Sequence, residues 1–364
     1  MVYCSCYTEQ HITHQGGSTM NSITSENAVV NGFHGNFDNE VIHGQKWTAA
    51  KVASRKMAAR LYAVGLNTRA ARMWTCGEYL IVRQTADGLT ADAPQLCRDR
   101  LCPVCSWRLS RRRFAEMMAV FNAIAPEMVA KNYTSTMLTL TIRNMALPDL
   151  HAAIDGMSQA WHNLIRREAF RQVAGWARSL EITYNAESKT YHPHMHIILI
   201  WEKYDDSAAT AETIRQGWKS VCKLDYTPII DIRPVYSRDA DGDTKSAVIK
   251  SALEAFKYSV KPDSAEKIPQ ADLFEFAAAI KGVRFVSYGK AIKRARSALG
   301  FKNEDCAEEM DTANALPDET VAAIMAWNGT SYTRAALTEG KWRLNPAEIA
   351  CAAAVAAAEG GDGV

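Results

Sequence analysis

Residues Tyr191–Ile200 read YHPHMHIILI, and this stretch decides how the middle of the chain is expected to fold. We predict a strand over His194–Trp201. Side chains two positions apart on a strand leave the same face, so His194 and His196 are expected to point in one direction. Two imidazoles placed in this way can bind one metal cation. His192 has the same parity, but a proline follows it and makes regular strand pairing there doubtful.

A carboxylate on the preceding strand is predicted to complete this site. Leu180–Tyr184 is expected to be a strand, joined to the next one by the polar turn Asn185–Thr190. If the hairpin turns about Ser188–Lys189, Glu181 lies opposite His196, and cross-strand partners share a face. The sequence therefore predicts a site of two imidazoles and one carboxylate.

Such a set of nitrogen and oxygen ligands leaves positions open for water and for a phosphate oxygen. Mg²⁺ or Mn²⁺ is the expected cation, and the histidines make Mn²⁺ the better fit. The alternative is a strand whose histidine rings only make ordinary hydrogen bonds.

The segments around the hairpin alternate between strand and helix patterns. Further strands are expected at Met137–Ile142 and Ile229–Val235, and helices at Asp149–Val173, Ala211–Leu224, Lys245–Val260, Asp272–Ile280 and Lys290–Leu299. The order β-α-β-β-α-β-α predicts an α/β (α+β) fold of the split βαβ kind, an antiparallel sheet with helices on its faces.

A second group of candidate residues lies on the helix predicted over Lys245–Val260. Glu254 and Tyr258 are spaced i, i+4, and Lys261 follows Tyr258 by three residues, so all three project from one side. A tyrosine with a pKa of about 10 is a poor nucleophile at neutral pH until a metal or a lysine stabilises its phenolate. The alternative is an ordinary solvated helix face.

Four of the nine cysteines lie within residues 74–105. Cys97, Cys102 and Cys105 have the spacing C-x₄-C-x₂-C, and Cys76, which lies upstream, is the expected fourth ligand. The beginning of the chain lacks the pattern of a secretory signal, so we expect a reducing cytoplasm, where clustered cysteines more often bind metal. The spacing predicts a structural zinc site. A redox CxxC and buried thiols without a metal are the alternatives.

A long helix is predicted over Ser106–Lys131, with arginines near its start. Its apolar stripe is expected at Phe114, Met117, Met118 and Phe121. The arginines of this helix are predicted to contact DNA phosphates. They are Arg108, Arg111, Arg112 and Arg113. The alternative is a run of charge that only keeps the helix soluble.

Three motifs in order give the chain a resemblance to a known family: LTLTIRN (Leu138–Asn144), HPHMH (His192–His196) and EAFKYSVK (Glu254–Lys261). The chain resembles the rolling-circle plasmid replication initiators, one branch of the HUH endonucleases. The resemblance covers roughly residues 74–300. It implies an HUH-type nicking domain with His194 and His196 as metal ligands.

The resemblance also implies a mechanism. Tyr258 matches the nicking tyrosine, which forms a 5′-phosphotyrosyl intermediate and releases a 3′-hydroxyl primer. Glu254 matches the carboxylate that activates water for the terminating cleavage, and Lys261 matches the Tyr-x-x-Lys pattern. Other HUH enzymes, transposases and relaxases, share this chemistry, and a zinc-containing DNA-binding protein without catalysis is the rival from another class.

Four regions are expected along the 364 residues, whose net charge is +2. Residues 1–45 are expected to be disordered, 46–131 to form a basic, Cys-rich zinc module, 132–300 the nicking domain, and 301–364 a partly flexible extension. The expected partner is plasmid origin DNA, single-stranded or cruciform. The chain has no GxxxxGK[ST] motif, so a host helicase is expected to unwind and a host polymerase to copy the DNA. No apolar run approaches the roughly 18 residues of a membrane span.

Overall fold

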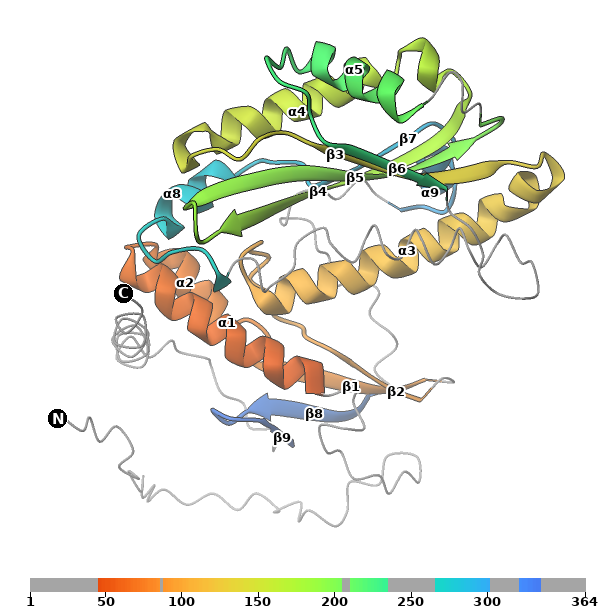
Figure 1. Ribbon diagram of the computed structural model, residues 1–364. Coiled ribbons are helices and arrows are strands. Elements are labelled where there is room, and N and C mark those ends of the chain that lie inside the picture. Colours follow the sequence, from red (N-terminus) through yellow and green to blue (C-terminus); the bar gives the residue numbers. More distant parts are fainter. Residues whose placement is uncertain (1–44, 86–87, 205–209, 235–265, 302–320, 335–364) are drawn as a thin grey trace, which may run out of the picture. The chain divides into compact units, whose positions relative to one another are not determined.

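The computed structural model describes residues 45–85, 88–204, 210–234, 266–301 and 321–334. These residues form two antiparallel sheets with helices packed around them (Figure 1). In this described part of the chain, none of the helices is both long enough and apolar enough to cross a membrane. The sequence-based prediction of an α/β fold with antiparallel strands is confirmed.

The larger sheet has five strands in the order β6-β3-β5-β4-β7. Its strands are β3 (Thr134–Thr141), β4 (Val173–Asn185), β5 (Thr190–Trp201), β6 (Ile230–Pro234) and β7 (Val286–Gly289). The central strand β5 lies between β3 and β4 and is antiparallel to both. The strand that carries the histidines is therefore held on both sides by hydrogen bonds.

Helices cover both faces of this sheet (Figure 1). On one side are α4 (Leu150–Leu164) and α5 (Ala211–Val221), and on the other α3 (Pro103–Ala130) and α9 (Lys290–Ala298). Met117 and Phe121 of α3 pack with Ile198 and Ile200 of β5 in one buried core. Burying a side chain of this size stabilises a fold by about 1.5–3 kcal/mol. This core occupies the sheet face that, by strand parity, also carries the histidines at 194 and 196.

The smaller sheet has four strands in the order β2-β1-β8-β9. The strands are β1 (Tyr79–Thr85), β2 (Gly88–Asp92), β8 (Val321–Trp327) and β9 (Tyr332–Arg334). The helices α1 (Gln45–Ala63) and α2 (Asn67–Trp74) precede β1 and pack against each other. Part of the segment 301–364, expected to be an extension, thus pairs with a strand from the Cys-rich region.

Short elements complete the described chain. They are the 3₁₀ turns η1 (Leu147–Asp149) and η2 (Glu168–Phe170) and the helix α8 (Leu273–Ala279). Helix α8 is tied to the start of β5, because the Tyr191 hydroxyl donates a hydrogen bond to Asp272 (2.9 Å) and the Tyr191 ring stacks on Phe276.

Two sequence-based boundaries are wrong for physical reasons. The helix expected over 149–173 ends at Leu164, and β4 begins at Val173. Both faces of β4 are buried, so its sequence lacks the alternation that indicates a half-buried strand. The apolar stripe of α3 is also rotated: Phe114 is exposed, whereas Val120 and Ile124 are buried with Met117. The segments 1–44 and 235–265 lie outside the described residues.

Candidate metal sites

The β4–β5 hairpin brings Glu181 to the two histidines, although not in the predicted register. Glu181 lies opposite His194, and Ser179 lies opposite His196. The expected pairing of Glu181 with His196 is therefore wrong. The loop 186–189 is centred one residue earlier than expected, because the Asn185 side chain accepts hydrogen bonds from the backbone N–H groups of residues 187 and 188. The observed partner of Glu181 differs from the expected one by two residues. Because side chains two residues apart on a strand share a face, Glu181, His194 and His196 still lie on the same face.

The three ligand atoms converge closely. Glu181 Oε2 lies 3.2 Å from His194 Nε2 and 3.5 Å from His196 Nε2. Three ligands at about 2.1 Å from a cation and at right angles to one another lie about 3.0 Å apart. The donor set and its spacing therefore fit a divalent cation. The side chain of Glu181 is 8% exposed, and those of His194 and His196 are 13% and 21% exposed, so the site is open to solvent on the histidine side.

The electrostatics of Glu181 favour its charged form. Burial by itself would raise the pKa of this carboxyl group, but hydrogen bonds from His194 and His196 and the charges of these rings lower the pKa to about 2. The carboxylate is therefore ionised at neutral pH and ready to bind a cation without first losing a proton.

The second nitrogen of each histidine also has a partner. Thr139 of β3 lies directly opposite His196, and its hydroxyl is 3.2 Å from His196 Nδ1. His194 Nδ1 lies 3.4 Å from the backbone oxygen of His192. Partners of this kind fix the orientation of a ligating imidazole and leave its other nitrogen for the metal. The sequence alone assigned no role to Thr139, although it stands in the motif LTLTIRN.

His192 extends the row of imidazoles on this face. Its ring stacks on that of His194, with the ring centroids 5.5 Å apart. The doubt about strand pairing at this position is wrong, because His192 pairs with Thr183 and the next residue pairs with Ile182. The start of the strand is held further by two backbone hydrogen bonds between Tyr191 and Met145. One further polar residue that sequence reasoning missed is Asp231 of β6, which lies opposite Thr139.

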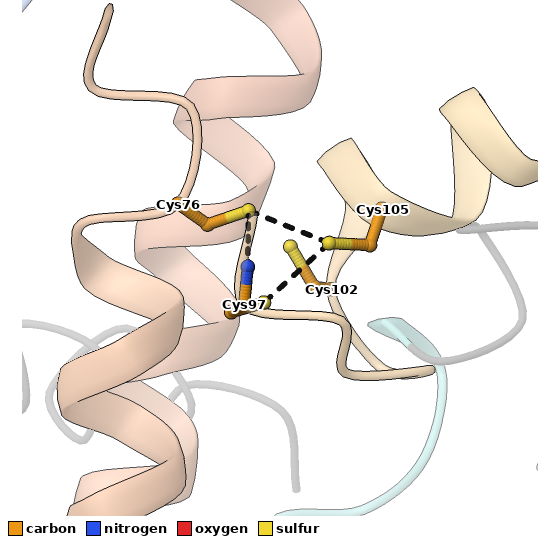
Figure 2. Close-up of side chains that lie close together, drawn as sticks. All are labelled: Cys76, Cys97, Cys102 and Cys105. Carbon is orange, nitrogen blue, oxygen red and sulfur yellow. Dashed lines mark hydrogen bonds between the residues drawn. The ribbon is translucent and has the colours of Figure 1, made fainter. Parts of the chain in front are cut away.

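Four cysteines form a second cluster, as Figure 2 shows. Their sulfur atoms all lie within 4.8 Å of one another, and all four residues are buried: Cys76, Cys97, Cys102 and Cys105. Cys105 Sγ lies 3.5 Å from Cys76 Sγ and 3.6 Å from Cys97 Sγ. Four sulfurs at about 2.3 Å around a tetrahedral zinc lie about 3.8 Å apart. The cluster therefore fits a single zinc ion.

Three segments of the chain position these sulfurs. Cys76 follows α2, Cys97 lies in the loop after β2, Cys102 caps the N-terminus of α3 and Cys105 lies in its first turn. The Cys97 N–H donates to Cys76 Sγ (3.4 Å), and the Ser54 hydroxyl lies 3.2 Å from Cys102 Sγ. The CxxC pair is thus one edge of a four-sulfur group, which a simple redox pair does not require.

The protonation of the cluster depends on its sulfur–sulfur contacts. Hydrogen bonds to the other three thiols, with burial, raise the pKa of Cys97 well above its ordinary value. Burial would also raise the pKa of Cys102, but hydrogen bonds from Cys105, Cys76, Cys97 and Ser54 lower it well below that value. A soft divalent cation would replace the remaining thiol protons, because zinc binds thiolates.

The four arginines of the predicted DNA contact have different surroundings. Arg111 is exposed and its guanidinium lies over Trp107, 5.6 Å from the ring centroid. Arg108 forms an ion pair with Asp92, and Arg112 forms one with Glu116 at 2.9 Å. Arg113 is buried. Their contact with DNA stays a prediction, and Arg111 is the arginine that presents the most surface for it.

The candidate nucleophile and its neighbours, Tyr258, Glu254 and Lys261, lie outside the described residues. Their roles rest on the motif alone, and no geometry connects them here to the histidines.

Comparisons with known proteins identify relatives over most of the chain. A family model described as a replication protein matches residues 89–334. A "Protein rep" of Lentilactobacillus hilgardii is 30% identical over 291 residues, covering 77% of this chain and 91% of its own. Similar proteins of the same description occur in Streptococcus pneumoniae serotype 2, with 27% identity over 299 residues, 79% of this chain and 90% of the relative. One from Bacillus amyloliquefaciens is 31% identical over 263 residues, 66% of this chain and 76% of the relative.

No solved structure matches this chain. The matched residues 89–334 include the whole Glu181–His194–His196 cluster and three of the four clustered cysteines.

Proposed function

This chain belongs to the replication protein family, the initiators of rolling-circle plasmid replication, and from this premise we propose that it is a metal-dependent HUH endonuclease that nicks one strand of plasmid origin DNA. The observation that carries the proposal is the cluster of Glu181, His194 and His196. It combines one carboxylate, which is ionised at neutral pH, with two imidazoles that are partly open to solvent.

Nicking follows from a tyrosine attack on phosphorus. The Tyr258 hydroxyl loses its proton and attacks the scissile phosphate, and the bond between phosphorus and the 3′-oxygen breaks. The 3′-oxygen takes up a proton and becomes the primer hydroxyl, while the 5′-phosphate stays bound to the tyrosine. A divalent cation, Mn²⁺ or Mg²⁺, held by Glu181, His194 and His196 would neutralise charge on the phosphate during this step.

Two neighbours in the motif complete the proposed cycle. Lys261 stabilises the phenolate of Tyr258 by its positive charge. Glu254 deprotonates a water molecule that attacks the phosphotyrosyl bond and releases the enzyme at termination. General base catalysis of this kind contributes about 10²- to 10⁴-fold to a rate.

The cysteine cluster has a separate role in this proposal. A zinc ion bound by four buried sulfurs has no open position for a substrate, so it stabilises the fold rather than the reaction. Its four ligands would tie the start of α3, which carries the exposed Arg111 and packs against α1, to the residue Cys76 that follows α2.

The decisive experiment is covalent capture of DNA. The protein is incubated with single-stranded oligonucleotides that span the plasmid origin and with Mn²⁺, and the adduct is mapped by mass spectrometry. We expect the adduct on Tyr258, its loss in Tyr258→Phe, and unchanged DNA binding by that variant. An adduct on another tyrosine refutes the assignment. DNA binding without any adduct favours a zinc-containing binding protein instead.

The role of Glu254 has its own test in the same assay. Glu254→Ala should form the adduct at the wild-type rate but release it about 10²-fold more slowly. Equal loss in both steps would show that Glu254 supports the fold or the first attack and not the water.

A further inference from the structure

A basic cavity lies between the Cys-rich region and α8, apart from the ligand atoms of the Glu181–His194–His196 cluster. Its volume is about 680 Å³, which is within the usual range for sites that bind small molecules or single nucleotides. Three parts of the chain line it: α2, residues 97–100, and α8 with the residues that follow it to 283. The proposed nicking reaction assigns no role to this cavity.

The charge of the lining is strongly positive. The lining contains five cationic side chains and one carboxylate, that of Asp99. The cations are Arg69, Arg72, Arg98, Arg100 and Lys281. Asp99 is bound by Arg69 through two hydrogen bonds of 2.7 and 2.9 Å, so this arginine already neutralises it. A surplus of this size within one concave surface attracts an anion.

The apolar part of the lining indicates which kind of anion fits. Phe274 of α8 lines the cavity and is 54% exposed, so its ring is accessible to a ligand. Ile280 and Val283 continue this apolar wall. A site for a bare phosphate gains nothing from an exposed phenyl ring, whereas a nucleobase stacks on one. The cavity thus offers positive charge for a phosphate and an aromatic surface for a base. Together these match a nucleotide.

Residues next to the cavity are linked to the hairpin that carries Glu181, His194 and His196. Immediately after the cavity residues, the backbone oxygen of Phe285 accepts a hydrogen bond from the Leu180 N–H (2.7 Å), and the next residue pairs with Ser179. Leu180 is adjacent to Glu181 in the chain. At the other side of the wall, Phe276 of α8 stacks on Tyr191, which begins the His-bearing motif. The cavity is therefore fixed to the same hairpin as the metal ligands.

We propose that this cavity binds an unpaired nucleotide of the single-stranded origin DNA, with its base on Phe274 and its phosphate among Arg98, Lys281 and their neighbours. The inference rests on the proposed function, because it takes the nicked strand as the source of the nucleotide. It adds a binding site, separate from the cutting site, that would hold the strand in position.

The test measures binding in the presence of chelator, so that cutting has no part in it. A fluorescent single-stranded oligonucleotide from the origin is titrated with the full-length protein at several salt concentrations. Phe274→Leu should weaken binding about tenfold, since stacking on an aromatic residue is lost, and Phe274→Trp should restore it. Zinc content and thermal melting of each variant confirm that the fold is intact.

Charge is tested by Arg98→Asn combined with Lys281→Gln. Asparagine tolerates the positive φ of 60° found at Arg98 better than most residues. We expect the dependence of binding on salt to become shallower, by about 0.7 in the slope for each phosphate that the variant no longer binds. Lys131→Gln is the matched control, because this exposed lysine directly follows the C-terminal end of α3 and does not line the cavity.

Photo-crosslinking locates the nucleotide directly. An oligonucleotide with 4-thiothymidine should crosslink to a peptide that contains Phe274. Duplex DNA or a free nucleoside monophosphate at equal concentration should not compete for this crosslink. If the wild-type protein binds and nicks DNA and the cavity variants bind it with the same affinity, this inference is overturned. The nicking proposal would then still stand. Failure of the wild-type protein to bind single-stranded DNA or to form an adduct would refute the proposed function itself.

Discussion

The cysteine cluster and the Glu–His–His cluster bring metal ligands together in opposite ways. The four cysteines come from three separate segments of the chain, are all buried and point their sulfur atoms toward one another. The three residues of the other cluster come from one hairpin and offer oxygen and nitrogen ligands, and its two histidines are partly exposed while Glu181 is buried. The first arrangement is complete without any molecule from outside, whereas the second leaves room for one.

This difference predicts which property each cluster controls. A closed sulfur site cross-links segments that are distant in the chain, so its loss should affect stability. The hairpin is already held by strand pairing on both sides, so its ligands can change without loss of the fold. Variants of the cysteine cluster should therefore lose stability, and variants of the Glu–His–His cluster should lose activity.

The largest expected effect is the loss of zinc. Cys105→Ser should abolish tight binding of about one zinc per chain and lower the melting temperature by about 10 °C or more, because metal binding and folding are coupled. Elemental analysis and thermal melting measure the two results. Cys222→Ser is the matched control, since Cys222 is a partly buried cysteine of the α5 C-terminus outside the cluster. Zinc-free wild-type protein with an unchanged melting temperature would contradict a structural metal.

Substitution of the histidines should have the converse effect. His194→Ala and His196→Ala should each reduce nicking by about 10²-fold or more, because charge neutralisation at the phosphate is lost, and should change the melting temperature by only a few degrees. Glu181→Ala should also weaken nicking. His192→Ala is the comparison within the same row of rings, and we expect a smaller loss of activity there. Full nicking by a double histidine variant, or in excess chelator, would refute the site.

The smallest of these effects concerns the hydroxyl that orients His196. Thr139→Val keeps the shape of the side chain but removes the partner of His196 Nδ1. Metal affinity should fall about 10- to 100-fold, while Thr139→Ser retains it. Titration with Mn²⁺ followed by calorimetry measures this directly. Equal affinity in the valine variant would show that the 3.2 Å contact does not hold the ring.

The sequence predicted the members of both clusters better than it predicted their surroundings. The parity of His194 and His196 follows from the period of a strand, and this period holds in any register. The register itself depends on how Asn185 closes the turn, which no apolar pattern reveals. The cysteine spacing predicted that Cys102 and Cys105 belong together, and the structure brings the distant Cys76 into the same group.

Other features could not be predicted because their causes are distant in the chain. The strands β1 and β8 pair across more than two hundred residues, and no local signal marks such partners. Arg113 carries a charge and yet is buried, because the apolar side of α3 is rotated from the one that Phe114 suggested. The residues around Tyr258 stay predictions, since they lie outside the described chain.

The pairing of β8 with β1 has a consequence for the order in which the protein is made. Val321–Trp327 leaves the ribosome roughly 200 residues after the last cysteine of the cluster, about 10–40 s later at ordinary rates of synthesis. Until then β1 has one open edge, which is the kind of surface that chaperones and proteases meet in unfinished chains. When β8 and β9 arrive, the Tyr332 hydroxyl donates a hydrogen bond to the backbone oxygen of Gly77, beside Cys76. A chain that stops before Tyr332 cannot make this hydrogen bond, so the cysteine region gains its full set of contacts only after these late strands are made.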